Sequence, residues 1–250
     1  MTAETQLVDQ KRDISQFKKL LENHSGLLGH LLGRGRLEIY NGLSKRSVRF
    51  VLVENSKKQN YLTFIQRECF KQNLFYGFNY MVIYEGRTTN QARLATNYTQ
   101  ESAYIALYDY FYIKYKQNTR NKTRFRIQKD ILLLPFTEKD LAYWFLEVGE
   151  FRNDKKEIVL NLSPCFDEDE GQLLCELINK KLSLTCKLRL FSSSNEIKIR
   201  SDQSKKNVFQ IVFLTDQLQK FYDLINKYFK NDPLVSNLDK ILTLENYALF

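Results

Sequence analysis

The pattern of helices and strands runs through this chain twice, and the repetition is the strongest constraint on its fold. Residues 26–34 have the apolar spacing of a helix, and strand-like segments 36–42 and 47–55 follow as a hairpin. Periodicity then predicts a helix at 61–74, strands at 79–86 and 91–98, and a helix at 101–115. A further helix at 14–24 precedes this first round, and residues 116–130 are predicted to be a basic loop.

The second round starts at Thr137, a residue type that commonly caps helix N-termini. Its predicted helices and strands are 137–151, 157–163, 167–182, 185–193 with 196–202 as a hairpin, 208–214 and 216–229. The repeat indicates an internal duplication with a pseudo-two-fold axis, each half being roughly 100 residues long.

The chain therefore divides into four predicted parts: an N-terminal extension (1–17), a first half (18–135), a second half (136–235) and a C-terminal tail (236–250). Only 3 prolines and 9 glycines occur in 250 residues, which argues against long linkers. No run of 18 apolar residues occurs, so we expect no membrane-spanning segment. The N-terminus has no apolar signal core. The four cysteines show no metal-ligand spacing, so we expect reduced core residues and no metal site built from them.

The formal net charge of +9 favours a polyanionic partner, with nucleic acid ahead of an anionic membrane. Basic residues recur along the predicted strands and in the loop between the halves, where they are either nucleic-acid contacts or part of a solvated outer face. The candidates are Arg34, Arg36, Lys45, Arg46, Arg49, Arg87, Arg93, Lys116, Lys122, Arg124, Arg126, Lys187, Arg189, Lys198, Arg200, Lys205 and Lys206.

Two nine-residue segments carry a family resemblance. "LLGHLLGRG" (27–35) and "LAYWFLEVG" (141–149) resemble the paired signature helices of the LAGLIDADG homing endonucleases, and segments 164–190 and 220–234 resemble the stretches that follow the second signature. The resemblance extends over roughly residues 18–235. It implies an α+β fold of two pseudo-symmetric αββαββα halves that form a saddle-shaped antiparallel sheet. It also implies signature helices packed side by side, where Gly29 and Gly33 permit close approach while Tyr143 and Glu147 make the packing lopsided.

In active members of that family an acidic residue precedes the last glycine of each signature and holds a divalent cation. Here those positions are Arg34 and Val148. Valine has no polar atom, and a guanidinium does not deprotonate, so neither side chain ligates Mg²⁺. Glu147 lies about 100° away around the helix, and Glu38 and Glu150 could substitute only with a displaced metal. Arg34 either neutralises a phosphate directly or interacts with the C-terminal dipole and carbonyls of its helix.

From this loss we predict a non-catalytic nucleic-acid-binding protein with no cofactor, one that favours RNA over DNA and is not an enzyme. A component of an organellar ribonucleoprotein, such as a mitochondrial ribosome or an intron-splicing cofactor, fits that prediction. The alternative is a site-specific DNA homing endonuclease or nickase with displaced catalytic acids, which would need Mg²⁺. A third reading is a DNA-binding regulator that does not cut.

We expect a monomeric clamp, and a mitochondrial or other organellar location follows from the Lys-, Asn-, Tyr-, Phe- and Ile-rich composition that AT-rich codons produce. The tail carries Leu238, Ile241, Leu242, Leu244 and Leu249, and it either docks on a neighbouring ribonucleoprotein protein or folds back on the domain.

Overall fold

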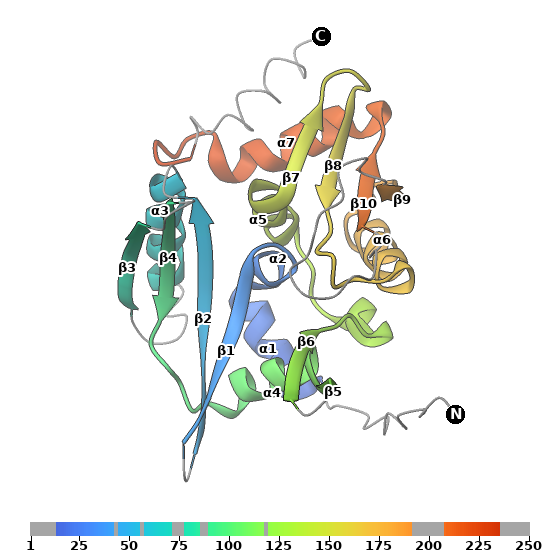
Figure 1. Cartoon of the computed structure of the whole chain (residues 1–250). Coiled ribbons are helices and arrows are strands. Elements are labelled where there is room, and N and C mark those ends of the chain that lie inside the picture. The colour runs from blue at the N-terminus through green and yellow to red at the C-terminus, as the bar shows by residue number, and fades with distance from the viewer. Residues whose placement is uncertain are drawn as a thin grey trace, which may run out of the picture.

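The computed structural model contains the predicted repeat as two αββαββα halves (Figure 1). It describes residues 14–42, 45–55, 58–71, 78–85, 90–117, 120–191 and 208–235. The first half comprises α2 (Leu27–Leu32), β1 (Gly35–Asn41), β2 (Arg46–Asn55), α3 (Gln59–Lys71), β3 (Phe78–Glu85), β4 (Asn90–Thr96) and α4 (Ser102–Phe111). The second half comprises α5 (Glu138–Val148), β7 (Gly149–Arg152), β8 (Glu157–Asn161), α6 (Glu168–Leu182), β9 (Cys186–Phe191), β10 (Val208–Phe213) and α7 (Leu218–Phe229).

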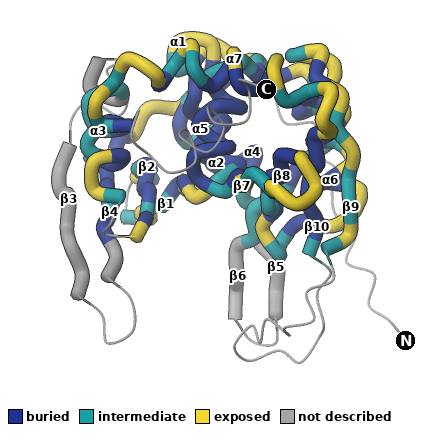
Figure 2. The backbone as a smooth tube through the Cα atoms, turned by 90° about the horizontal axis from the view of Figure 1, so that it is seen from above, coloured by how far each residue is buried: buried dark blue, intermediate teal, exposed yellow. Residues whose placement is uncertain are grey.

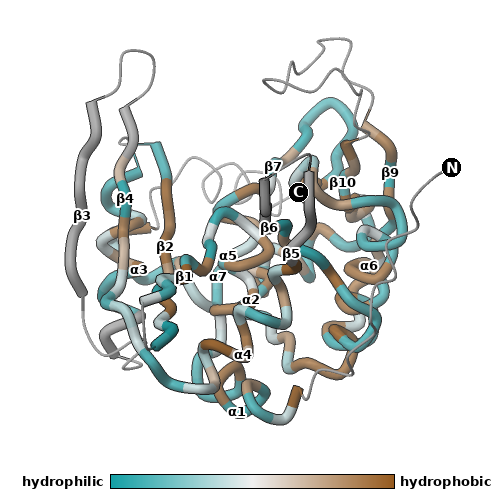
Figure 3. Tube along the Cα trace, turned by 60° about the horizontal axis from the view of Figure 1, so that its bottom comes forward, coloured by the Kyte–Doolittle hydropathy of each residue, from teal (hydrophilic) through white to brown (hydrophobic). Residues whose placement is uncertain are grey.

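Each half contributes one four-stranded antiparallel sheet, and together the sheets form a saddle. The strand orders are β1-β2-β4-β3 in the first sheet and β7-β8-β10-β9 in the second, so equivalent strands occupy equivalent places. The edge strands β1 and β7 follow directly from α2 and α5, which lie between the two sheets (Figures 1 and 3). Helices pack on one face of each sheet, and the other face carries the partly exposed side chains.

Helices α2 and α5 form the buried centre of the molecule (Figure 2). A Cβ atom added at Gly29 would lie 2.0 Å from the carbonyl oxygen of Asp140, and one added at Gly33 would lie 2.2 Å from Glu147 Oε2. At Gly29 only glycine allows the α5 backbone to come this close, which confirms its predicted role, whereas Gly33 leaves room for the Glu147 side chain. The partner positions Tyr143 and Glu147 are large, and the His30 ring stacks on Tyr143 at 4.5 Å. The packing is therefore lopsided, as expected.

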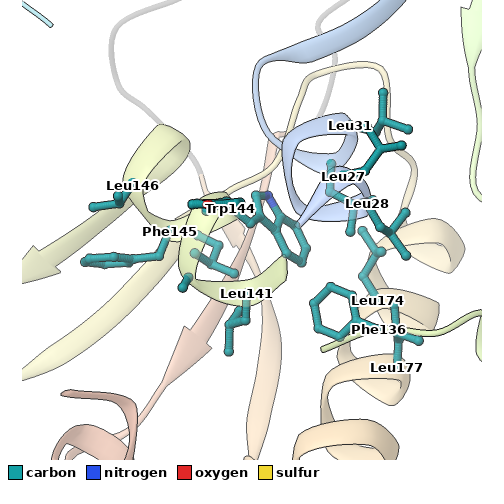
Figure 4. Close-up of a cluster of buried hydrophobic side chains, with 14 of the residues drawn as sticks. Leu27, Leu28, Leu31, Phe136, Leu141, Trp144, Phe145, Leu146, Leu174 and Leu177 are labelled. Carbon is teal, nitrogen blue, oxygen red and sulfur yellow. The ribbon is translucent and has the colours of Figure 1, made fainter. Parts of the chain in front are cut away.

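A continuous apolar core joins the two halves around this helix pair. Trp144 projects from α5 toward Leu27 and Leu28 of α2, and Phe136 lies against Leu174 and Leu177 of α6 (Figure 4). The Phe136 and Trp144 rings meet edge to face at 6.5 Å. The halves therefore share one core.

Two elements differ from the sequence predictions. The predicted basic loop at 116–130 is wrong, because β5 (Tyr112–Gln117) pairs with β6 (Arg120–Phe125), and a short 3-10 helix, η3 (Lys129–Leu133), follows. The helix predicted at 101–115 accordingly ends at Phe111. Strand β9 pairs with β10 along one edge, and its predicted pairing with 196–202 stays a prediction because 196–202 lies outside the described residues. Helix α1 (Ser15–Asn23) precedes the first half as expected.

The predicted strand at 196–202, most of the N-terminal extension and the tail lie outside the described residues.

The contact at Gly29 gives a stability test. Replacing Gly29 by alanine is expected to lower the free energy of unfolding by about 3 kcal/mol, because the added methyl group meets the backbone of α5. Gly42→Ala is the matched control, since its Cβ would come no closer than 3.2 Å to the Lys45 carbonyl oxygen. Urea denaturation of both variants measures the difference, and equal losses would contradict the packing described.

Candidate nucleic-acid interface

The N-terminal end of α2 is capped by a side chain from the other half. Asp140 Oδ1 accepts hydrogen bonds from the backbone N–H groups of Gly26 and Gly29, at 3.0 and 3.1 Å. Its Oδ2 accepts from Thr137 in the capping box of α5, which confirms Thr137 as the N-cap. Burial raises the pKa of the Asp140 carboxyl, and these hydrogen bonds oppose the rise. One carboxylate thus ties the starts of both central helices together.

The C-terminal end of α2 is held by Glu147, two turns further along α5. Glu147 Oε2 accepts the backbone N–H of Arg34 at 2.5 Å, and Oε1 lies 2.5 Å from His30 Nδ1 and 3.1 Å from the Tyr61 hydroxyl. Burial, reinforced by the charge of Glu147, raises the pKa of Tyr61 well above its ordinary value, so its hydroxyl remains a donor. Glu147 is 1 % exposed. It is therefore committed to the helix pair, which agrees with the prediction that it does not replace the missing acid.

The two signature positions lie where α2 and α5 pass into β1 and β7. Arg34 Nη1 donates to Glu54 Oε2 at 3.0 Å, and Glu54 Oε1 also lies 3.3 Å from Lys58 Nζ. Val148 packs against the core. A hard divalent cation needs several oxygen ligands, whereas these positions present a guanidinium and an isopropyl group. The residues at the signature positions therefore do not fit a magnesium ion. Among the described residues no group of three or more His, Cys, Asp or Glu side chains could hold a metal.

The open face of the first sheet carries three of the predicted arginines in one cluster. Arg36, Arg49 and Arg93 all bond to Glu38, at 2.8, 2.6 and 2.8 Å, and the Arg49 guanidinium also lies 4.6 Å from the centre of the Tyr98 ring. Burial favours a higher pKa for Glu38, but the hydrogen bonds and charges of these arginines outweigh it and lower the pKa. Glu38 therefore holds three arginines together on the open face of the sheet, and its carboxylate cancels one of their three positive charges.

The open face of the second sheet has the opposite arrangement at the matching register. The final glycine of each signature pairs with a leucine, Gly35 with Leu52 and Gly149 with Leu160. Three residues further along each strand, Glu38 faces Arg49 in the first sheet. The equivalent pair in the second sheet is Arg152 facing Glu157, so the charges are exchanged between the strands.

Glu157 is held by arginines of its own sheet. Arg189 bonds to both of its carboxylate oxygens, at 2.7 and 3.0 Å, and donates to Gln210. Gln210 in turn donates to Asn161 at 2.6 Å. The two open faces therefore present different hydrogen-bonding groups to whatever lies against them.

Of the remaining predicted basic residues, five have described side chains and seven do not. Arg46 forms a two-bond ion pair with Asp109, and Arg124 and Arg126 lie against Glu170 of α6, while Lys45 and Lys187 are exposed. The side chains of Lys116 and Lys122 are not described, although β5 and β6 are. Four residues lie outside the described part between β9 and β10, and one more lies between β3 and β4; these are Lys198, Arg200, Lys205, Lys206 and Arg87. Nucleic-acid contact at all these positions stays a prediction.

Sequence reasoning missed Glu54, Lys58 and Arg152. Glu54 stands two residues beyond the leucine that pairs with Gly35, so its place beside Arg34 follows from the strand register. Arg152 stands three residues after the second signature glycine, where the first half has Glu38. Aligning the two halves on their signature glycines would have found Arg152, whereas Glu54 depends on the strand register and Lys58 on its contact with Glu54.

The arrangement of two αββαββα halves around a close helix pair is the fold of the LAGLIDADG homing endonucleases. The homing endonuclease I-WcaI bound to its DNA recognition sequence has this fold, with a TM-score of 0.61 at 21% identity over 96% of this chain and 94% of that one. The model of the LAGLIDADG DNA endonuclease family matches residues 25–221, so the chain belongs to this family. "Probable intron-encoded endonuclease 1" of Wickerhamomyces canadensis is 25% identical over 228 residues, covering 88% of this chain and 84% of that protein.

These findings overturn two predictions. The prediction of a non-catalytic, RNA-favouring protein of an organellar ribonucleoprotein is wrong, and so is the prediction that the chain is not an enzyme. Both rested on two signature positions, whereas the family match and the endonuclease relative extend over most of the chain. The comparisons favour the alternative, a DNA endonuclease with displaced acids.

In the described part of the chain no helix is long and apolar enough to cross a membrane.

The Glu38 cluster makes stability depend on pH in a defined direction. Because the folded-state pKa of Glu38 is lowered, its stabilising effect is present above its ordinary pKa and is lost as the pH falls through the lowered value. Above roughly pH 5 the wild type is expected to be more stable than Glu38→Gln by up to about 1 kcal/mol, and the difference is expected to shrink as the pH falls through the lowered pKa of Glu38. Urea denaturation across this range measures the effect. A constant difference at every pH would show that the arginines do not act on the Glu38 charge.

Proposed function

We propose that this protein is a site-specific DNA endonuclease of the homing class that binds one duplex as a monomer and cuts a single strand. The observation that carries the proposal is the continuous similarity of both halves to a relative named as an intron-encoded endonuclease. Both four-stranded sheets and both signature helices are complete, so the framework for DNA binding is whole.

The two open faces suit duplex DNA. Positive charge along a polyanion contributes sequence-independent affinity, and arginine forks read base edges in the major groove. The first sheet offers Arg36, Arg49 and Arg93, and the second offers Arg152 and Arg189. Each set is fixed by a carboxylate, so the arginines are positioned before DNA arrives.

One carboxylate near the signature positions stays accessible. Glu147 is buried, Glu54 is bonded to Arg34 and Lys58, and Glu38 is bonded to three arginines. The side chain of Glu150 is 54% exposed and lies 4.0 Å from Arg152 Nε. By elimination among the described acids next to the signatures, Glu150 is the residue we assign to the reaction.

Hydrolysis of a phosphodiester needs a base for the attacking water and positive charge near the phosphate oxygens. We assign the first role to Glu150 and the second to Arg152. No step is assigned to a metal ion, because Arg34 and Val148 do not fit one. Whether Mg²⁺ takes part at a displaced position is decided by running the assay with and without a chelator.

The test is cleavage of a plasmid library in Mg²⁺ or Mn²⁺ buffer, followed by sequencing of the broken ends. Wild-type protein is expected to nick one strand at a defined sequence. Glu150→Gln is expected to lower the nicking rate at least about a hundredfold, the effect of removing a general base. Glu168→Gln, on the exposed first turn of α6, is the matched control and should nick like the wild type.

Two results would count against the proposal. Specific DNA binding without any strand break under either metal would contradict the endonuclease. Normal nicking by Glu150→Gln would leave the endonuclease in place and remove Glu150 from the reaction.

A further inference from the structure

Three charged residues form an ion cluster next to the C-terminal end of α2, and we call Arg34, Glu54 and Lys58 the foot cluster. Arg34 Nη1 and Lys58 Nζ contact opposite oxygens of Glu54, at 3.0 and 3.3 Å. Lys58 Nζ also donates to the carbonyl oxygen of Leu146 near the C-terminal end of α5, at 3.5 Å. Two cations share one carboxylate, so the foot cluster carries a net charge of +1.

The cluster has a buried base and an exposed cation. The Glu54 side chain is 0% exposed, whereas the Arg34 side chain is 48% exposed. A guanidinium presents five N–H donors in a planar fork, and in the described part of the chain only Nη1 of Arg34 has a side-chain partner. The outer part of the fork is therefore available to an oxyanion, and bidentate binding of phosphate is the geometry that it favours.

Arg34 is also held in place from two directions. Its backbone N–H is bonded to Glu147 of the other half, and its side chain is bonded to Glu54 of β2. The C-terminal ends of α2 and α5 meet here and carry partial negative charge, which stabilises cations at this place. An arginine fixed in this way loses little conformational entropy when it binds a ligand.

We propose that the foot cluster binds one backbone phosphate of the DNA through Arg34, at the end of the first signature helix, with Glu54 as the positioning residue. This proposal rests on the proposed DNA binding. It assigns the two signature ends different tasks: the first holds the phosphate of one strand without cutting it, and the second, with Glu150, acts on the other strand.

The test measures DNA affinity against salt concentration for a long duplex. A protein that loses one phosphate contact loses about 0.9 from the slope of log K against log salt. Arg34→Gln is expected to show this change together with about tenfold weaker binding. Arg34→Lys keeps the charge and loses the fork, so it should keep the slope and still bind more weakly. Arg67→Gln is the control, since Arg67 is a partly exposed arginine of α3 that is paired with Asp232 and has no contact with the foot cluster among the described interactions.

Phosphate ethylation interference identifies the contact directly. In the wild type, ethylation of one phosphate near the middle of the binding site should block binding, and in Arg34→Gln that single interference should disappear. A slope and an ethylation pattern unchanged from the wild type would overturn the proposal.

Two further outcomes have separate meanings. If Arg34→Gln unfolds, the Arg34→Lys protein decides, and unchanged affinity there overturns the proposal. If the wild type binds no DNA at all, the proposed function fails first, which this assay reports independently of the variants.

Discussion

Everything in this molecule depends on how α5 holds both ends of α2. Asp140 and Glu147 stand two turns apart on one face of α5, and each accepts backbone N–H groups of the other half. The N–H groups at a helix start have no partner within the helix, so buried ones need an acceptor from elsewhere. Gly29 lets the two backbones come close, and Gly33 leaves room for the Glu147 side chain, so these bonds can form. The distance between the sheets follows from this pair.

The same arrangement decides what the signature positions can do. Because Glu147 is used inside the helix pair, it is withdrawn from the open side of the molecule. The backbone N–H of Arg34 is bonded to Glu147, and its side chain is bonded to Glu54. On the second side Val148 packs into the core and leaves Glu150 as the exposed acid. The chain thus keeps the family's scaffold while the charges at the two helix ends have become unlike.

The sequence predicted the repeat, the helix pair and its glycines, because periodicity and small residues act locally. It did not predict β5 and β6, because Ile113 and Tyr115 continue the apolar and aromatic pattern of α4 and the basic residues after them are typical of a loop. It did not predict that β9 pairs with β10, because that contact joins segments far apart in the sequence. Thr137 was identifiable as a cap, but the second use of Asp140, on residues more than 110 positions earlier, depends on tertiary contact. The functional prediction failed for a different reason: Arg34 and Val148 are two positions, whereas the similarity to the endonuclease family extends over residues 25–221.

The cross-half hydrogen bonds also bear on how a duplicated gene diverges. An ancestor with two equal repeats would have had the same donors and acceptors on each central helix. Here the acceptors Asp140 and Glu147 stand on one helix and the glycines on the other. Two copies of the first half could not associate as the halves do now, since neither copy would supply a carboxylate for Gly26 and Arg34. The two repeats have become complementary. Neither could associate with a copy of itself unless one helix carried both the carboxylates and the glycines.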